Sequence, residues 1–150
     1  MKISSTAFAH NASIPAKYTC DGSDINPPLQ FSDIPPEAKS LVLLMDDPDV
    51  PKSVRTDGMW DHWIVWNIPP TTTLIAEGKA PAGTIGKSSF GEQSYGGPCP
   101  PDREHRYFFK LYALDTMLDL PAGSSKTEVE KVMEGHILVQ AILMGRYNRN

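Results

Sequence analysis

The stretch Ser94-Tyr-Gly-Gly-Pro-Cys-Pro-Pro-Asp-Arg-Glu-His-Arg-Tyr-Phe-Phe-Lys-Leu-Tyr-Ala-Leu114 joins a stiff loop to a strand. Proline fixes φ and lacks an N–H donor, which excludes Gly97-Pro-Cys-Pro-Pro101 from helices and central strands. Side chains alternate along a strand, so His105, Tyr107 and Phe109 are expected on one face. A rigid loop that ends at the head of an apolar face is typical of a pocket wall.

Two further predicted strands also carry a polar residue at one end of an apolar face. Ser40–Asp47 is apolar on both faces, as in a strand covered from both sides, and Asp47 continues one of these faces. Alternation in Asp61–Ile68 predicts that His62 also begins an apolar face. The other members of the two faces are Leu41, Leu43 and Met45 in the first strand and Ile64, Trp66 and Ile68 in the second. If the three strand ends are neighbours, Asp47, His62 and His105 build one pocket.

The rest of the chain predicts short elements around these strands. Ser124 or Ser125 is expected to cap a helix that runs to Met133 and ends at Gly135. Segment 71–93 has little periodicity and is predicted to be a long ordered loop. The remaining predicted strands are Ile3–Phe8, Leu29–Phe31 and residues 136–144.

The composition describes an ordinary globular protein. At 150 residues, with 40% hydrophobic and 21% charged content, the chain is expected to form a single domain, residues 1–150. The 14 prolines favour short strands over long helices. A net charge of −4 without a Lys/Arg run argues against a nucleic-acid partner. Without an apolar run of ~20 residues or a convincing signal peptide, we expect no integral membrane segment and a cytoplasmic location.

Three motifs together resemble one family. Asp47-Pro-Asp-Val-Pro51 resembles an Asp-Pro-Asp-Ala-Pro motif, and His62-Trp-Ile-Val-Trp-Asn-Ile-Pro69 resembles a His-containing strand that leads to Asn-Ile-Pro. Gly97-Pro-Cys-Pro-Pro101 with His105-Arg-Tyr107 resembles a Gly-Pro-Pro and His-Arg-Tyr pair. These are motifs of the phosphatidylethanolamine-binding protein family, also called the Raf kinase inhibitor protein family. The match covers most of the chain and is closest to the shorter prokaryotic branch.

The resemblance implies both a fold and a pocket. The fold is mainly β, an antiparallel Greek key with a large central sheet, a smaller sheet and one or two short helices. The pocket takes phosphate-like anions and phospho-head-groups. Carried over by motif, its residues are Asp47, His62, Gly97, Cys99, Pro100, His105 and Tyr107.

We therefore expect a small-molecule binding protein rather than an enzyme, without a cofactor or metal. Two imidazoles can donate to phosphate oxygens, and a bound dianion favours their protonated forms, so affinity is expected to fall as pH rises through the histidine range. Asp47 would orient a histidine or face the ammonium group of a zwitterion such as phosphoethanolamine. Two alternatives stay open at this point. Asp47, His62 and His105 could form a metal site, and Cys99 beside His105 could be the nucleophile of a low-activity hydrolase.

Other partners and a disulfide are also open. The family has been linked to serine-protease inhibition and kinase regulation, and the 71–93 segment is the best candidate for a surface that would bind such a partner. Tyr112, Phe108 and the C-terminal strand could form a homodimer face. If Cys20 lies beside the 96–101 loop, it can bond to Cys99, whereas a cytosolic setting favours two reduced thiols.

Overall fold

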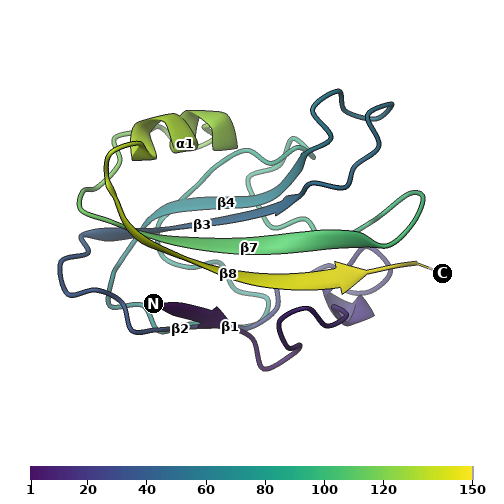
Figure 1. Cartoon of the computed structure of the whole chain (residues 1–150), viewed down its shortest axis with the longest axis horizontal. Coiled ribbons are helices and arrows are strands. Elements are labelled where there is room, and N and C mark those ends of the chain that lie inside the picture. Colours follow the sequence, from purple (N-terminus) through teal and green to yellow (C-terminus); the bar gives the residue numbers. More distant parts are fainter. Residues whose placement is uncertain (150) are drawn as a thin grey trace.

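A computed structural model describes residues 1–149 and contains two antiparallel sheets (Figure 1). The five-stranded sheet has the order β6-β4-β3-β7-β8, and the three-stranded sheet has the order β1-β2-β5. The large sheet comprises β3 (Ser40–Asp47), β4 (Trp60–Ile68), β6 (Thr84–Ile85), β7 (His105–Leu114) and β8 (Ile137–Tyr147). The small sheet comprises β1 (Lys2–Ser4), β2 (Leu29–Ser32) and β5 (Leu74–Ile75). A short 3₁₀ turn, Ala16–Tyr18, and the helix α1, Lys126–Met133, complete the chain.

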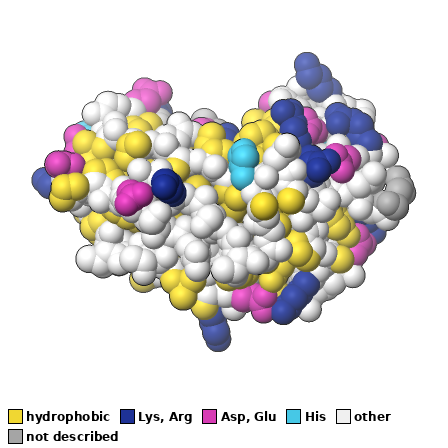
Figure 2. Space-filling model, turned by 60° about the horizontal axis from the view of Figure 1, so that its bottom comes forward, with side chains coloured by type: hydrophobic (Ala, Val, Ile, Leu, Met, Phe, Trp, Pro, Cys, Tyr) yellow, Lys and Arg dark blue, Asp and Glu magenta, His cyan; other side chains and the backbone are white. Residues whose placement is uncertain are grey.

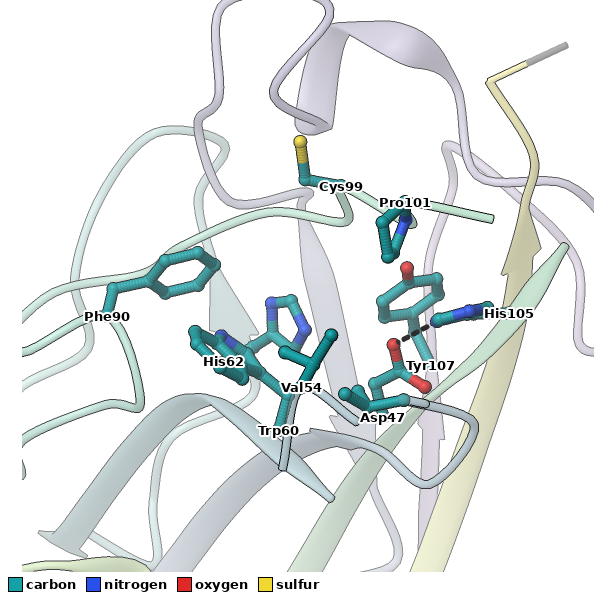
Figure 3. A pocket seen from close by; sticks show the side chains of 10 residues that line it. Asp47, Val54, Trp60, His62, Phe90, Cys99, Pro101, His105 and Tyr107 are labelled. Carbon is teal, nitrogen blue, oxygen red and sulfur yellow. Dashed lines mark hydrogen bonds and ion pairs between the residues drawn. The ribbon is translucent and has the colours of Figure 1, made fainter. Parts of the chain in front are cut away.

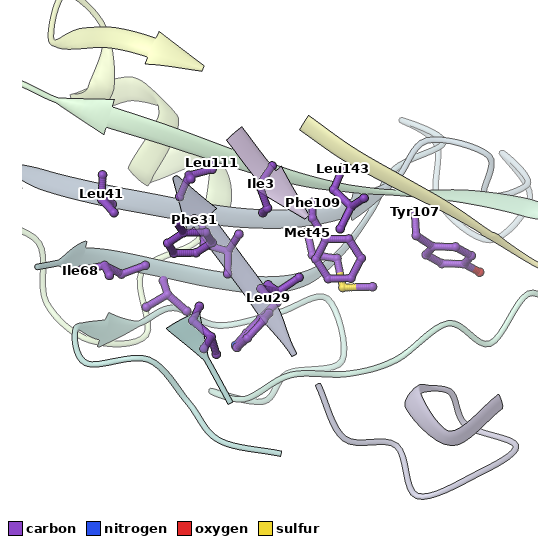
Figure 4. Close-up of a cluster of buried hydrophobic side chains, with 14 of the residues drawn as sticks. Ile3, Leu29, Phe31, Leu41, Met45, Ile68, Tyr107, Phe109, Leu111 and Leu143 are labelled. Atoms are coloured by element: carbon purple, nitrogen blue, oxygen red, sulfur yellow. The ribbon is translucent and has the colours of Figure 1, made fainter. Parts of the chain in front are cut away.

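These elements form three layers, with the large sheet between the small sheet and α1 (Figure 1). The larger core, which includes Phe31, Met45 and Phe109, lies between the two sheets (Figure 4). A smaller core that contains Ile64 and Val129 lies between the large sheet and α1. All eight residues of β3 are buried, because cores lie on both of its faces. The predicted mainly β fold, with a large sheet, a smaller sheet and a short helix, is confirmed.

Helix α1 begins and ends where its capping residues predict. The Ser125 side chain accepts a hydrogen bond from the Glu128 amide, and the Glu128 carboxylate accepts one from the Ser125 amide. Gly135 follows the helix with a φ of 80°, a backbone conformation that glycine adopts at little cost. No helix within residues 1–149 is long and apolar enough to cross a membrane.

Three element boundaries differ from the predictions. The first strand ends at Ser4, and Phe8 instead contributes its ring to the core from a loop. The last strand continues to Tyr147, since it pairs with β7 along its whole length. Segment 71–93 is mostly irregular, as predicted, but it contains the two-residue strands β5 and β6.

The prediction that His62, Ile64, Trp66 and Ile68 share a face was wrong. Met45 pairs with Trp63 but Asp46 pairs with Asp61, so His62 is an extra residue in β4. A second irregularity follows at Asn67, which has a φ of 55° and lies between the pairs of Leu43 and Leu41.

Ile64 and Trp66 pack on the side of the sheet that faces α1, whereas Ile68 packs into the core between the two sheets. A β-bulge re-aims the side chains around it, which period-2 alternation cannot anticipate. The first bulge brings His62 to the same cavity as Asp47.

Candidate functional site

A cavity of about 240 Å³ lies where β3, β4 and β7 meet the loops beside them (Figure 3). Its lining residues are Asp47, Val50, Val54, Trp60, His62, Phe90, Cys99, Pro101, His105 and Tyr107. The sequence-predicted residues Asp47, His62, Cys99, His105 and Tyr107 are therefore brought together. Gly97 and Pro100 belong to the adjoining loop but do not line this cavity.

A fully buried histidine bridges two carboxylates on one side of the cavity. His105 Nδ1 lies 2.6 Å from Asp47 Oδ2, and its Nε2 lies 2.7 Å from Asp102 Oδ1. An imidazolium would donate to both oxygens, whereas a neutral ring could donate to only one. Burial raises the pKa of Asp47, partly offset by the hydrogen bonds that it accepts from His105 and from the Asp49 amide. Both ring nitrogens are engaged, so the predicted direct donation from His105 to an anion does not fit this arrangement.

The Asp-Pro-Asp and His-Arg-Tyr motifs interlock at this edge. Asp47 faces inward to His105, while Asp49 faces outward and accepts hydrogen bonds from Arg106 Nε at 2.9 Å and Nη2 at 2.8 Å. The Arg106 guanidinium holds the pKa of Asp49 below its usual range. Alternation along β7 places His105 and Arg106 on opposite faces, so these adjacent residues bind one carboxylate at the end of β3 and one in the loop that follows it. This double connection fixes the loop that forms one wall of the cavity.

His62 presents one ring nitrogen to the cavity. Its Nδ1 lies 2.7 Å from the Gly96 carbonyl oxygen, so Nδ1 carries the proton and donates. Burial lowers the pKa of His62 to about 4, which makes the ring neutral at pH 7. The unprotonated Nε2 is then a hydrogen-bond acceptor. The Phe90 and Tyr107 rings hold the imidazole between them, each edge-on with centroids 5.3 Å away.

Tyr107 supplies the other unused polar group. Its side chain is fully buried, and its hydroxyl lies close to the Asp47 carboxylate and the Cys99 backbone but makes no hydrogen bond of normal geometry within residues 1–149. Burial and then the nearby Asp47 carboxylate raise the pKa of Tyr107, so the phenol keeps its proton. A buried hydroxyl without a partner is costly unless a ligand or water completes it.

The cavity walls are otherwise apolar and carry no Lys or Arg side chain. Lys and Arg side chains instead gather, with acidic neighbours, toward one end of the face shown in Figure 2. Outside the cavity, Arg146 forms an ion pair with Glu104, and Arg149 forms one with Asp21. An anion in the cavity would therefore meet no basic side chain other than histidine.

The 96–99 loop is fastened to the segment around Cys20. A Cβ on Gly97 would lie 2.2 Å from the Tyr18 carbonyl oxygen, so only glycine fits there. The Gly97 amide donates to Asp24 Oδ1 at 2.8 Å, so it is not free to donate to an anion. Cys20 and Cys99 form a disulfide, so of the two states that the sequence left open the bonded one is found. With its sulfur bonded, Cys99 is not a thiolate nucleophile, so this route to hydrolysis was wrong.

A family model described as phosphatidylethanolamine-binding protein matches residues 4–148. The chain belongs to the phosphatidylethanolamine-binding protein family. A UPF0098 protein from Chlamydia trachomatis is 49% identical over 150 residues that cover 100% of both chains. Another UPF0098 protein, from Methanothermobacter thermautotrophicus, is 48% identical over 155 residues and covers 99% of both.

Solved structures agree with the family assignment. A crystal structure of a putative phosphatidylethanolamine-binding protein homolog from Chlamydia trachomatis superposes with a TM-score of 0.96 at 49% identity, covering 99% of this chain and 97% of that one. Escherichia coli YbcL, described as a new member of the mammalian family, superposes with a TM-score of 0.89 at 28% identity, covering 99% and 98%. The predicted family is confirmed.

Sequence reasoning missed most of the apolar residues that line this cavity. Trp60 precedes the predicted strand, and Phe90 and Val54 are single apolar residues in polar loops. Loop residues lack a periodicity that would indicate where they point. Asp102 was also missed, although its place three residues before His105 is a signal that could have suggested the contact.

The alternative metal site does not form in this arrangement. Both ring nitrogens of His105 are engaged by carboxylates, and His62 Nδ1 is engaged by a backbone carbonyl. Residues 1–149 contain no group of three or more His, Cys, Asp or Glu side chains placed to hold a metal ion. The three residues therefore line the cavity without forming a metal-binding group.

Proposed function

We propose that this protein binds a small ligand with a phosphate-like head and an apolar portion, and that it takes up a proton with the anion. The observation that carries the proposal is the fully buried Tyr107 hydroxyl, which has no partner and lies in the cavity beside His62. The hydroxyl donates to one anion oxygen. The apolar portion of the ligand packs against Trp60 and Phe90.

The proton follows from the charges around the cavity. His62 is neutral in the free protein and offers only an acceptor, while Asp47 repels an anion. An anion 3–4 Å from His62 favours the imidazolium, which donates from Nε2. The proton then supplies the positive charge that the wall lacks. In a zwitterionic ligand such as phosphoethanolamine, the ammonium group faces Asp47.

Calorimetry between about pH 5 and 8 tests this binding mode with sulfate, phosphoethanolamine and ethanolamine as separate probes. Sulfate keeps its charge over this range, so its affinity should fall by up to about tenfold per pH unit as one proton is taken up. His62→Gln and Tyr107→Phe should each weaken binding by roughly tenfold, the effect of losing one hydrogen bond to a charged group. His136→Gln is the matched control, because His136 is exposed and lies outside the cavity. Equal sulfate affinity at all pH values would contradict proton uptake, and unchanged affinity in both pocket variants would contradict the site.

Two other expectations stay predictions. A protease or kinase partner that contacts segment 71–93 is an alternative function, testable by replacing that loop before a pull-down. The cytoplasmic location also stays a prediction, and the Cys20–Cys99 disulfide bears on it because cytosolic thiols are usually kept reduced.

A further inference from the structure

Asp102 contacts the buried histidine of the cavity without lining the cavity itself. Its Oδ1 lies 2.7 Å from His105 Nε2, while the other ring nitrogen lies 2.6 Å from Asp47 Oδ2 at the cavity wall (Figure 3). The Asp102 side chain is 40% exposed, whereas the His105 ring is fully buried. A carboxylate in contact with solvent is thus joined through one imidazole ring to a carboxylate that faces the cavity.

Hydrogen bonding at the outer contact decides which ring nitrogen carries a proton. An ionised carboxylate can only accept hydrogen bonds. Asp102 stays ionised, because the hydrogen bond with His105 holds the pKa of this carboxyl below its usual range. Arg103 Nε, 3.7 Å from the other Asp102 oxygen, acts in the same direction. His105 Nε2 therefore carries a proton and donates it to Asp102.

The inner contact then needs a second proton. With Nε2 protonated, a neutral ring has only a lone pair at Nδ1, which cannot approach an ionised Asp47 oxygen to 2.6 Å. The proton of this contact lies either on Nδ1, beside a carboxylate, or on Asp47, beside a neutral ring. In both cases the Asp47–His105 pair has no net charge.

Two other carboxylates close to this pair in the sequence have basic partners of their own. Asp49 forms an ion pair with Arg106 at 2.8 Å. Glu104 forms one with Arg146 at 3.0 Å. These two carboxylates therefore bind arginine rather than the His105 ring, and the outer ring proton is held by Asp102.

We propose that Asp102 enables this cavity to accept an anion, because it holds a proton on His105 Nε2 and so keeps the Asp47–His105 pair neutral. This role rests on the proposed function, in which Asp47 repels the anionic head of the ligand. Without an acceptor at Nε2, the ring releases that proton and keeps only the one that it donates to Asp47. Asp47 then faces the cavity as an uncompensated carboxylate. Asp102 is thus a positioning residue that selects the charge of the ligand.

Nitrogen-15 NMR of the ligand-free protein with labelled imidazoles tests the proton assignment. The chain has four histidines, and the signal of His105 is the one absent from His105→Gln. In wild type at pH 7, His105 Nε2 should be protonated. Asp102→Asn replaces the acceptor by an amide that can donate, so Nε2 should lose its proton. Glu104→Gln is the matched control, because it removes the same charge two residues away and should leave His105 as in wild type.

Calorimetry at pH 7 with sulfate and with ethanolamine then measures the charge of the cavity wall. In Asp102→Asn, sulfate should bind at least about tenfold more weakly and ethanolamine more tightly, as expected for one added negative charge a few ångströms from the ligand. Glu104→Gln should keep both affinities within about twofold, because solvent and salt screen an exposed charge.

Four results would overturn this role of Asp102. They are an unprotonated Nε2 in wild type, a proton that stays on Nε2 in Asp102→Asn, a sulfate affinity that this variant does not lower, and a loss of affinity for both probes, which would indicate a distorted cavity. Wild type that binds neither probe would refute the proposed function, while the NMR result would still decide the charge of the Asp47–His105 pair.

Discussion

Removal of the Cys20–Cys99 disulfide should cost a large part of the stability of this protein. The bond closes a loop with a sequence separation of 79 residues. In the chain-entropy model, a cross-link that closes a loop of that length stabilises the folded state by about 4.5 kcal/mol at 25 °C, because it lowers the entropy of the unfolded chain. Unfolding free energies are commonly ~5–15 kcal/mol, so this one bond is a substantial share.

Three hydrogen bonds should preserve the native loop geometry without the bond. The Cys20 amide donates to Pro98 O at 3.1 Å, Gly97 donates to Asp24 at 2.8 Å, and the Tyr95 hydroxyl donates to Tyr18 O at 2.7 Å. The loss should therefore act mainly through the unfolded state. That state would expose more surface when released, so the urea m-value should rise as well.

Urea unfolding of wild type with and without reductant, compared with the Cys20→Ser/Cys99→Ser variant, measures the effect. With an m-value of about 2 kcal/mol/M, the midpoint should fall by roughly 2 M in the reduced and serine forms. Reductant should not change the serine variant, which controls for other effects of the reagent. Oxidised and serine forms with equal unfolding free energies would refute the unfolded-state argument.

Three further changes test other parts of the fold. Lys126→Met leaves the buried Asp46 carboxylate without one of its two lysines and should lower the free energy of unfolding in urea by about 3 kcal/mol. The control Lys131→Met, at an exposed position, should lower it by under ~0.5 kcal/mol. Similar losses in both variants would contradict a stabilising role of the buried ion pairs. The pKa of His62 falls from 6.5 to about 4 on folding, so the unfolded state binds more protons than the folded state between these pH values. The free energy of unfolding should therefore drop by roughly 3 kcal/mol as pH falls through this window. Thermal melts at several pH values measure this drop, and His62→Gln should remove it. Gly97→Ala adds a Cβ for which the loop has no room. The variant should lose about 1–3 kcal/mol of unfolding free energy and bind ligand more weakly in calorimetry. Wild-type values for both quantities would show that the loop can shift to accept the methyl group.

Short-range patterns were enough to predict much of this structure. Apolar runs bounded by Pro and Gly located β3 and β7, and Ser125 with Glu128 located the start of α1. Each of these signals acts within a few residues, so the linear order of the chain contains it. The family motifs also named five of the ten residues that line the cavity.

The atomic arrangement of the site depended on tertiary structure. The bulge at His62 arises from the register between β3 and β4, and no alternation within β4 contains that register. Asp102 and Asp47 engage both nitrogens of His105, while the hydroxyl of Tyr107 is left unpaired, because three separate segments converge there. The sequence alone therefore determined the longer strands, the helix and the identity of most polar residues that line the cavity. Only the folded chain decided which of their atoms are free to meet a ligand, because hydrogen-bond partners come from residues distant in sequence.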